Sequence, residues 1–451
     1  MKVALKSLGC RLNEAELERW AAGFQADGHQ LTTAADDADL LVVNTCAVTR
    51  EAAKKSRQMI RRSRRRNAKA KLVVSGCYAS LQPGATGQLP GVDLVIGNSD
   101  KDSLVDIVRQ RLAVEAMPAT ATEPGETALF KRGRNRAFIK VQDGCRHKCT
   151  FCIVTVARGA ERSRTTREIV DEINSLHLSQ VREAVLTGVH IGGYGHDLGT
   201  DLPALIKTVL AETDIPRLRL GSLEPWNIDD IFFELFDNPR FMPHLHLPMQ
   251  SGSDSVLRRM GRRCKRSHFV KLAEKLRQQV PDLNITTDII AGFPGETAGE
   301  WRQTMDFCRE VGFPHIHVFP YSARADTRAA LLPGQLPPGI KKQRCTELHH
   351  LATQMKHDYR RRFPGRDFKV LVESDTGEIN GQRVRFGYTP NYLRTALPIS
   401  GAFPRSNSIV TVRIEEYDER CSALVAQADF SGAPGQPEAL PRLSPGLPAW
   451  R

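Results

Sequence analysis

The chain has 451 residues, which is enough for two or three domains that each bury a core. Its 64 Lys and Arg residues outnumber its 51 Asp and Glu residues, and the net charge of +13 and the pI of about 9.4 favour a polyanionic partner such as nucleic acid. Its ten cysteines are too sparse for the disulfide framework of a small secreted protein, and no apolar run suits a signal peptide or a membrane span. We therefore expect a reduced, cytoplasmic protein that has no membrane partner.

Three apolar segments near the start each end at a cysteine: VALKSLGC at Cys10, DLLVVNTC at Cys46 and KLVVSGC at Cys77. Each is typical of a buried parallel strand, and with a further strand, VDLVIGN, they predict an α/β domain over residues 1–113. The clearest helix is expected from Asn13, as its N-cap, to Gly28, which ends it. Ligands sit beyond the carboxyl ends of parallel strands, so the three cysteines can converge there. The alternative is that they are ordinary buried thiols.

Residues 114–130, rich in Pro, Thr and Ala, are expected to form a linker. Six strand-like segments follow in residues 131–362, and helix-like stretches separate them. They are RAFIKVQ, EAVLTGVHI, RLRLGSL, HLHLPMQ, NITTDIIAG and HIHVFPY. This alternation predicts a barrel-like parallel sheet with six strand–helix units instead of the eight of a full barrel.

A loop with three closely spaced cysteines follows the first of these strands. In DGCRHKCTFC, Cys145, Cys149 and Cys152 have the spacing C-x3-C-x2-C. Three thiolates on a 4Fe–4S cluster leave one iron free to bind S-adenosylmethionine. The alternative is a zinc site with a fourth ligand, for which His147 is the nearest candidate.

After residue 362 the pattern changes to short alternating strands. DFKVLVES, GQRVRFGY, SIVTVRIEEY and CSALVAQA predict a small closed β-domain over residues 363–430, of a kind that often binds RNA. The tail, residues 431–451, is rich in Pro and Gly and is expected to be disordered. The most basic stretch of the chain, Lys54–Lys71, is either a solvated helix face or a contact for RNA phosphates.

Several motifs together resemble the radical S-adenosylmethionine methylthiotransferase family, and the resemblance runs from Cys10 to about Ala428. It rests on GCRLN, VVNTCAVT, SGCYA, VQDGCRHKCTFC, ARGAERSR, LTGVHIGGYG, LPMQSGSDSVLRRMGR, TTDIIAGFPGET and GYTPNYLR. The family implies a 4Fe–4S cluster on Cys145, Cys149 and Cys152, the catalytic cysteines, and a second on Cys10, Cys46 and Cys77. It also implies a C-terminal TRAM domain.

The resemblance further implies two S-adenosylmethionine molecules per turnover. One methylates a sulfur atom, and the other gives a 5′-deoxyadenosyl radical that removes hydrogen from an unreactive carbon. An electron donor such as flavodoxin or ferredoxin is expected as a partner, and the sulfur donor is unknown. By the same resemblance, several residues lie near S-adenosylmethionine: Phe151, Thr187, Gly188, Gln250, Ser251, Asp288, Gly292 and Glu296. Arg158, Arg162 and Arg164 are candidates for carboxylate or phosphate contacts.

The choice of substrate rests on two segments, SLGCRLNEAE and GYTPNYLR. They resemble the branch that modifies carbon 2 of threonylcarbamoyladenosine beside the tRNA anticodon (position 37) more than the branches for isopentenyladenosine or a ribosomal protein aspartate. Thr155, Val156 and Ala323 depart from the family's usual residues, which leaves the detailed shape of the pocket open. A non-catalytic iron–sulfur RNA-binding regulator is the rival from another functional class.

Overall fold

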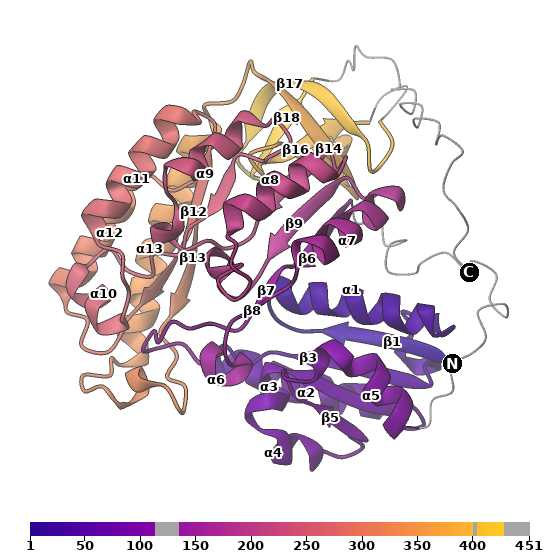
Figure 1. The fold of residues 1–451 in the computed structure, drawn as a ribbon. Coiled ribbons are helices and arrows are strands. Elements are labelled where there is room, and N and C mark those ends of the chain that lie inside the picture. Colours follow the sequence, from indigo (N-terminus) through magenta and orange to yellow (C-terminus); the bar gives the residue numbers. More distant parts are fainter. Residues whose placement is uncertain (113–134, 400–403, 428–451) are drawn as a thin grey trace. The chain divides into compact units, whose positions relative to one another are not determined.

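The computed structural model describes residues 1–112, 135–399 and 404–427. The expected linker, residues 114–130, and the expected tail, residues 431–451, lie outside the described residues. The chain forms two compact units, Met1–Arg362 and Phe363–Arg451, which we describe separately (Figure 1). Each helix in the described ranges is too short or too polar to span a lipid bilayer.

The first unit begins with a five-stranded parallel sheet in the order β2-β1-β3-β4-β5. The strands are β1 (Lys2–Ser7), β2 (Gln30–Leu31), β3 (Leu40–Thr45), β4 (Lys71–Gly76) and β5 (Leu94–Ile96). The helices are α1 (Arg11–Ala26), α2 (Arg50–Arg66), α3 (Cys77–Leu81), α4 (Pro83–Gly87) and α5 (Leu104–Arg111). Strands β3 and β4 are almost entirely buried, which explains their continuous apolar sequences. The predicted parallel-sheet domain is confirmed.

The expected N-cap of α1 is wrong by three residues. The helix begins at Arg11, with Cys10 as its N-cap, while Asn13 lies inside the first turn. The Asn13 amide instead donates hydrogen bonds to the carbonyl oxygens of Leu8 (2.8 Å) and Thr45 (3.2 Å). Asn13 thus holds the loop before the helix against the end of β3. At the other end, Gly28 adopts a φ of +80°, which favours glycine and ends the helix as predicted.

The rest of the first unit contains the six predicted strands, each parallel to its neighbour. One group has the order β10-β9-β6 and the other β11-β12-β13, with isolated bridges between β10 and the region of β11. The strands are β6 (Arg136–Lys140), β9 (Glu183–Thr187), β10 (Arg217–Leu220), β11 (His244–His246), β12 (Asn284–Ala291) and β13 (His315–Pro320). A short antiparallel pair, β7 (Gln142–Asp143) and β8 (Arg162–Ser163), frames the cysteine loop. The predicted partial barrel is confirmed.

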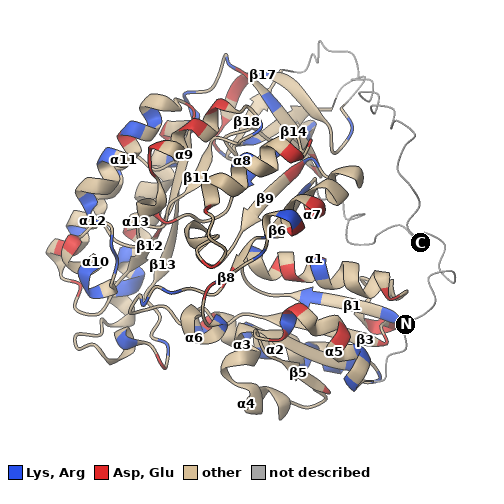
Figure 2. Ribbon diagram, viewed as in Figure 1, with Lys and Arg blue, Asp and Glu red and all other residues tan. Residues whose placement is uncertain are grey.

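Helices follow the strands of this partial barrel and cover it (Figure 1). They are α6 (Val154–Arg158), α7 (Thr166–Leu178), α8 (Leu202–Glu212), α9 (Asp230–Glu234), α10 (Asp254–Met260), α11 (Arg266–Gln279), α12 (Ala298–Val311) and α13 (Pro338–Arg360). Their apolar faces and the strands form one large core, in which Cys264 and Cys308 are buried. Figure 2 shows basic residues on α10, α11 and α12 as well as in the N-terminal region, so the positive charge is not confined to one element.

The second unit is a closed β-barrel in the order β14-β15-β16-β18-β17. Its strands are β14 (Asp367–Ile379), β15 (Gln382–Tyr388), β16 (Arg394–Pro398), β17 (Ile409–Asp418) and β18 (Ala423–Ala426). The pairs are antiparallel except for β16 and β18, which are parallel. The predicted β-domain is confirmed, but strand β16, with the sequence RTALP, was not among the predicted strands.

Candidate active site

The loop with three cysteines joins β7 to α6 and is held from two sides. The backbone N–H of Thr150 donates to the Met260 carbonyl at the end of α10 (2.9 Å), and its hydroxyl donates to the Arg259 carbonyl (2.8 Å). The Thr150 carbonyl in turn accepts a hydrogen bond from the Ala329 N–H (2.8 Å). Thr155, at a position where the sequence departs from the family, donates its hydroxyl hydrogen to the His147 carbonyl (3.0 Å). These bonds place the loop beyond the carboxyl end of β6.

The three thiols of this loop are close enough to influence one another. Burial raises the pKa of Cys152 to about 12, and the neighbouring thiols of Cys149 and Cys145 act in the same direction. Backbone N–H groups of His147 and Val154 point at the sulfur atoms of Cys145 and Cys152, both at 3.4 Å. The three thiols are free, and backbone N–H groups point at two of the sulfur atoms. This set of sulfur ligands fits an iron–sulfur cluster with one open iron.

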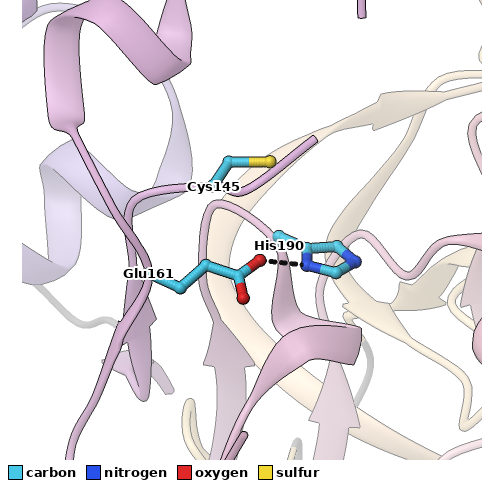
Figure 3. A group of neighbouring side chains, drawn as sticks. All are labelled: Cys145, Glu161 and His190. Carbon is cyan, nitrogen blue, oxygen red and sulfur yellow. Dashed lines mark hydrogen bonds and ion pairs between the residues drawn. The ribbon is translucent and has the colours of Figure 1, made fainter. Parts of the chain in front are cut away.

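Cys145 also lies beside a polar group made by Glu161 and His190 (Figure 3). Nδ1 of His190 is 2.7 Å from Oε1 of Glu161, and Nε2 of His190 is 3.0 Å from Nε2 of His147. Because Nε2 of His147 faces His190, that ring nitrogen is engaged outside the three-cysteine set. Burial, followed by His190, lowers the pKa of His147 to about 4. We therefore interpret His147 as a support of the loop, and not as the fourth ligand of a zinc site.

Cys10, Cys46 and Cys77 come together beyond the carboxyl ends of β1, β3 and β4. Burial raises the pKa of Cys46 to about 11, and the thiols of Cys77 and Cys10 act in the same direction. Gly9, at a φ of +132°, permits the close approach, since a Cβ there would lie 2.9 Å from Cβ of Cys46. Asn98 donates to the sulfur of Cys77 at 3.8 Å. This second set of three free thiols fits a second cluster by the same chemistry.

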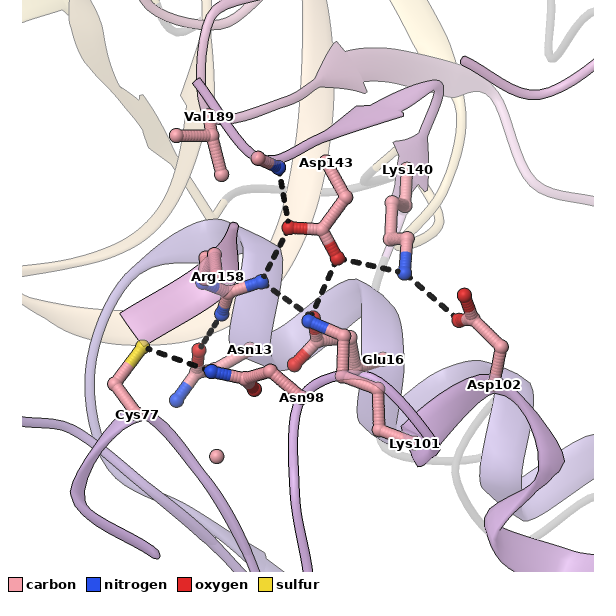
Figure 4. A network of polar contacts seen from close by, with 12 residues as sticks. Asn13, Glu16, Cys77, Asn98, Lys101, Asp102, Lys140, Asp143, Arg158 and Val189 are labelled. Atoms are coloured by element: carbon pink, nitrogen blue, oxygen red, sulfur yellow. Dashed lines mark hydrogen bonds and ion pairs between the residues drawn. The ribbon is translucent and has the colours of Figure 1, made fainter. Parts of the chain in front are cut away.

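A buried network of charges joins the two cysteine sets (Figure 4). Arg158, six residues after Cys152, donates to Glu16 of α1 (2.8 Å), to Asp143 (3.0 Å) and to the side-chain oxygen of Asn13 (2.9 Å). Lys101 pairs with both carboxylates, and its side chain is fully buried. Burial acts to raise the pKa of Glu16, but Arg158 and Lys101 outweigh it and lower that pKa to about 2. The candidate contact of Arg158 is thus a carboxylate of the protein itself.

The other two candidate arginines have different surroundings. Arg164 donates to Glu172 at 2.6 Å and to the Lys140 carbonyl at 2.9 Å, so it too contacts a carboxylate of the chain. Arg162 is exposed on the short strand β8.

The predicted cofactor residues Thr187 and Gly188 lie at the end of β9, directly against Gln142. The side-chain oxygen of Gln142 accepts hydrogen bonds from the backbone of Val189 (3.0 Å) and His190 (2.9 Å), and its amide donates to the Gly144 carbonyl (2.8 Å). A Cβ at Gly188 would lie 3.0 Å from that oxygen. Gln142 therefore ties the glycine-rich turn to the cysteine loop, a role that the sequence analysis missed.

Gln250 and Ser251 follow β11, Asp288 lies within β12, and the three have different surroundings. Gln250 adopts a φ of +78° and exchanges backbone hydrogen bonds with Asp288 and Ile290, both at 2.9 Å. The Asp288 carboxylate lies 3.2 Å from Nε2 of His246. The Ser251 hydroxyl is fully buried and lies 3.2 Å from the Thr304 hydroxyl, so it faces the interior and not the rim.

Gly292 and Glu296 belong to the turn after β12. The Glu296 carboxylate is buried, accepts a hydrogen bond from the Gly292 N–H (2.8 Å) and pairs with Arg344 of α13. Burial raises its pKa. Glu296 thus supports the shape of the turn from behind. Phe151 packs against an apolar group at the ends of β12 and β13 that includes Ile290 and Tyr321.

Two family models match the chain. Residues 2–97 match the model described as "Uncharacterized protein family UPF0004", and residues 139–308 match the radical SAM superfamily. The threonylcarbamoyladenosine tRNA methylthiotransferase MtaB of Bacillus subtilis is 35% identical over 423 residues, which cover 91% of this chain and 93% of the relative. The protein of the same name from Thermotoga maritima is 37% identical, over 82% of this chain and 86% of the relative.

The chain belongs to the radical SAM methylthiotransferase family. A second branch of this family also matches, because a tRNA-2-methylthio-N(6)-dimethylallyladenosine synthase of Bacillus cereus is 32% identical over 86% of this chain and 79% of that relative. Among solved structures, the radical S-adenosylmethionine methyltransferase TsrM of Kitasatospora setae has a TM-score of 0.54 at 16% identity, over 70% of this chain and 72% of that one. This last likeness concerns the fold alone. The methylthiotransferase assignment was predicted from the motifs and is confirmed.

Proposed function

We propose that this protein inserts a methylthio group at carbon 2 of threonylcarbamoyladenosine in tRNA, beside the anticodon. The observation that carries the proposal is the pair of three-cysteine sets, each at the carboxyl ends of parallel strands and joined through Arg158. Five relatives named threonylcarbamoyladenosine tRNA methylthiotransferase, 32–37% identical to the chain, support the choice of nucleoside. The net charge of +13 suits a tRNA substrate.

Cys145, Cys149 and Cys152 would hold one 4Fe–4S cluster, and Cys10, Cys46 and Cys77 would hold another. When bound, the clusters and two molecules of S-adenosylmethionine per turnover would supply two groups. One is a radical that removes hydrogen from carbon 2, and the other is the methylated sulfur that takes the place of that hydrogen. Acid–base catalysis by a side chain does not suffice, because that C–H bond is not acidic near neutral pH.

The residues of the chain position these groups. Gln142 and the backbone of Thr187–His190 shape the wall next to the cysteine loop, where Thr187 and Gly188 are proposed cofactor contacts. The backbone of Gln250, the segment from Asp288 to Gly292, and Phe151 form the remainder of the proposed S-adenosylmethionine site. Ser251 and Glu296 are assigned a positioning role there, because their polar groups are occupied within the protein.

We further propose residues 1–113 as the domain of the second cluster, residues 131–362 as the radical SAM core and residues 363–430 as a TRAM domain that holds tRNA. The protein would work in the cytoplasm and receive electrons from a donor such as flavodoxin or ferredoxin. A reduced compartment suits its ten free cysteines.

The test uses anaerobically reconstituted protein, a chemical reductant, S-adenosylmethionine and synthetic anticodon stem-loops that carry threonylcarbamoyladenosine or isopentenyladenosine. Mass spectrometry should show a methylthio group on the first nucleoside and 5′-deoxyadenosine among the products. Methylthiolation of the isopentenyl stem-loop alone would assign the chain to the other tRNA branch. The absence of 5′-deoxyadenosine with every reductant would favour a non-catalytic iron–sulfur regulator.

A further inference from the structure

Three arginines lie beside the N-terminal cysteine set and have no acidic partner among the described residues. They are Arg50 and Arg57 of α2 and Arg324, which follows β13, and we call them the arginine triplet. Nε of Arg50 donates to the Ala323 carbonyl at 2.9 Å, and the Arg50 N–H points at the Ser322 hydroxyl at 3.4 Å. These bonds join the first turn of α2 to the loop that contains Arg324, although the two are far apart in sequence.

The triplet is linked to Cys46 by sequence and by charge, since Arg50 begins α2 four positions after Cys46 and the Cys46 thiol acts on Arg324. Burial, followed by repulsion from Arg50, lowers the pKa of Arg324; Arg57 acts in the same direction, and the Cys46 thiol acts in the opposite direction. Arg57 lies over the ring of Tyr78, the residue after Cys77, at 5.7 Å. The positive end of the 17-residue helix α2, capped by Thr49, points to the same place.

Some half-buried or buried arginines of the unit are paired with carboxylates, whereas Arg64, Arg240 and Arg277 donate to backbone carbonyl oxygens. Arg158, Arg164 and Arg262 have carboxylate oxygens at 2.8, 2.6 and 2.7 Å. In the described residues, no carboxylate forms an ion pair with a member of the triplet, and Nε of Arg324 is buried without a hydrogen-bond partner. Arg57 and Arg324 are half-buried and Arg50 is exposed. Like charges gathered without a counter-charge favour the binding of an anion.

We propose that the arginine triplet binds the carboxylate of the threonylcarbamoyl group on the substrate. This inference rests on the proposed function and adds the residues that select the substrate. Carbon 2 and the N6 substituent of adenine lie on either side of ring nitrogen N1, on the same edge of the base. If carbon 2 reaches the sulfur held near Cys46, the N6 group lies close to the same cysteine set, and its carboxylate can reach a fork of guanidinium donors.

The experiment compares two anticodon stem-loops that differ at one group: threonylcarbamoyladenosine with a free carboxylate, and the same nucleoside with that carboxylate as a methyl ester. Wild-type protein should favour the acid over the ester by roughly 10- to 100-fold in kcat/KM, as expected for a charge-assisted hydrogen bond. Arg324→Gln and Arg57→Gln should remove most of this preference and raise KM for the acid more than they lower kcat. Arg328→Gln, an exposed change in the same loop, is the matched control and should retain the preference.

Equilibrium binding of both stem-loops to each variant gives a readout that does not need turnover, and iron content shows that each variant is folded and loaded. If Arg324→Gln and Arg57→Gln weaken both stem-loops and an unmodified one equally, the triplet binds RNA phosphate and the proposal is overturned. If the variants methylthiolate both stem-loops more slowly by the same factor while binding is unchanged, the triplet serves sulfur delivery and the proposal is again wrong. If wild-type protein modifies neither stem-loop, the proposed function itself fails.

Discussion

The guanidinium of Arg158 lies 2.8 Å from the carboxylate of Glu16, although 142 positions separate the two residues (Figure 4). Glu16 belongs to the helix that Cys10 caps, and Arg158 ends the short helix that follows Cys152. The side chains of both residues are about 2% exposed. The ion pair therefore fixes the position of one cysteine set with respect to the other.

Removing Arg158 should strongly destabilise the first unit. Arg158→Ala leaves Glu16 and Asp143 buried with fewer partners, so we expect the free energy of unfolding to fall by about 3–5 kcal/mol. Urea unfolding of the metal-free protein measures this loss. Arg167→Ala, which removes an exposed pair with Asp171, is the control and should change stability by less than about 1 kcal/mol. Equal losses for the two variants would contradict the role of the network.

The same network should make the metal-free protein sensitive to acid. The pKa of Glu16 is lowered to about 2 in the folded state, from an ordinary value of 4.5. A lowered carboxyl pKa stabilises the fold above the ordinary value, and this stabilisation is lost as pH falls from about 4.5 towards 2. Urea unfolding between about pH 5 and pH 3 should show a steep loss that Glu16→Gln reduces. An unchanged slope in that variant would contradict the pKa assignment.

The cysteine loop should hold half of the iron. The wild-type protein, reconstituted without oxygen, should bind about eight irons as two cubane clusters. Replacing Cys145, Cys149 and Cys152 together by Ala should leave about four and abolish 5′-deoxyadenosine formation. Cys345→Ala and Cys421→Ala, at cysteines outside both sets, should leave the iron content unchanged. Iron at the two-cluster level in the triple variant would show that the ligand assignment is wrong.

The N-terminal cysteines should separate sulfur insertion from radical formation. With Cys10, Cys46 and Cys77 replaced by Ala, the protein should still form 5′-deoxyadenosine but should not methylthiolate RNA. Chromatography of both products from the same reaction makes the comparison. Complete loss of S-adenosylmethionine cleavage, in a variant that is folded and keeps about four irons, would assign a different role to these cysteines.

The sequence predicted the elements better than it predicted the orientation of side chains. The six barrel strands and the three N-terminal strands were predictable because strand-like apolar or alternating segments are separated by helix-like stretches. Strand β16 was missed because RTALP is short and contains a proline. The inward orientation of Ser251 and the role of Gln142 depend on contacts with Thr304 and with the loop after β9, and such long-range contacts leave no local pattern. The arginine triplet was hidden for the same reason, since α2 and the loop after β13 meet only in the fold.

The central claim is most directly tested in cells. The chain should be expressed in a Bacillus subtilis strain that lacks its own MtaB, the relative that is 35% identical, and the nucleosides of total tRNA should be analysed by mass spectrometry. We predict that the methylthio form of threonylcarbamoyladenosine returns with the wild-type chain and does not return with the variant in which Cys145, Cys149 and Cys152 are Ala. If the iron-loaded wild-type chain leaves threonylcarbamoyladenosine without a methylthio group, the proposed function is contradicted.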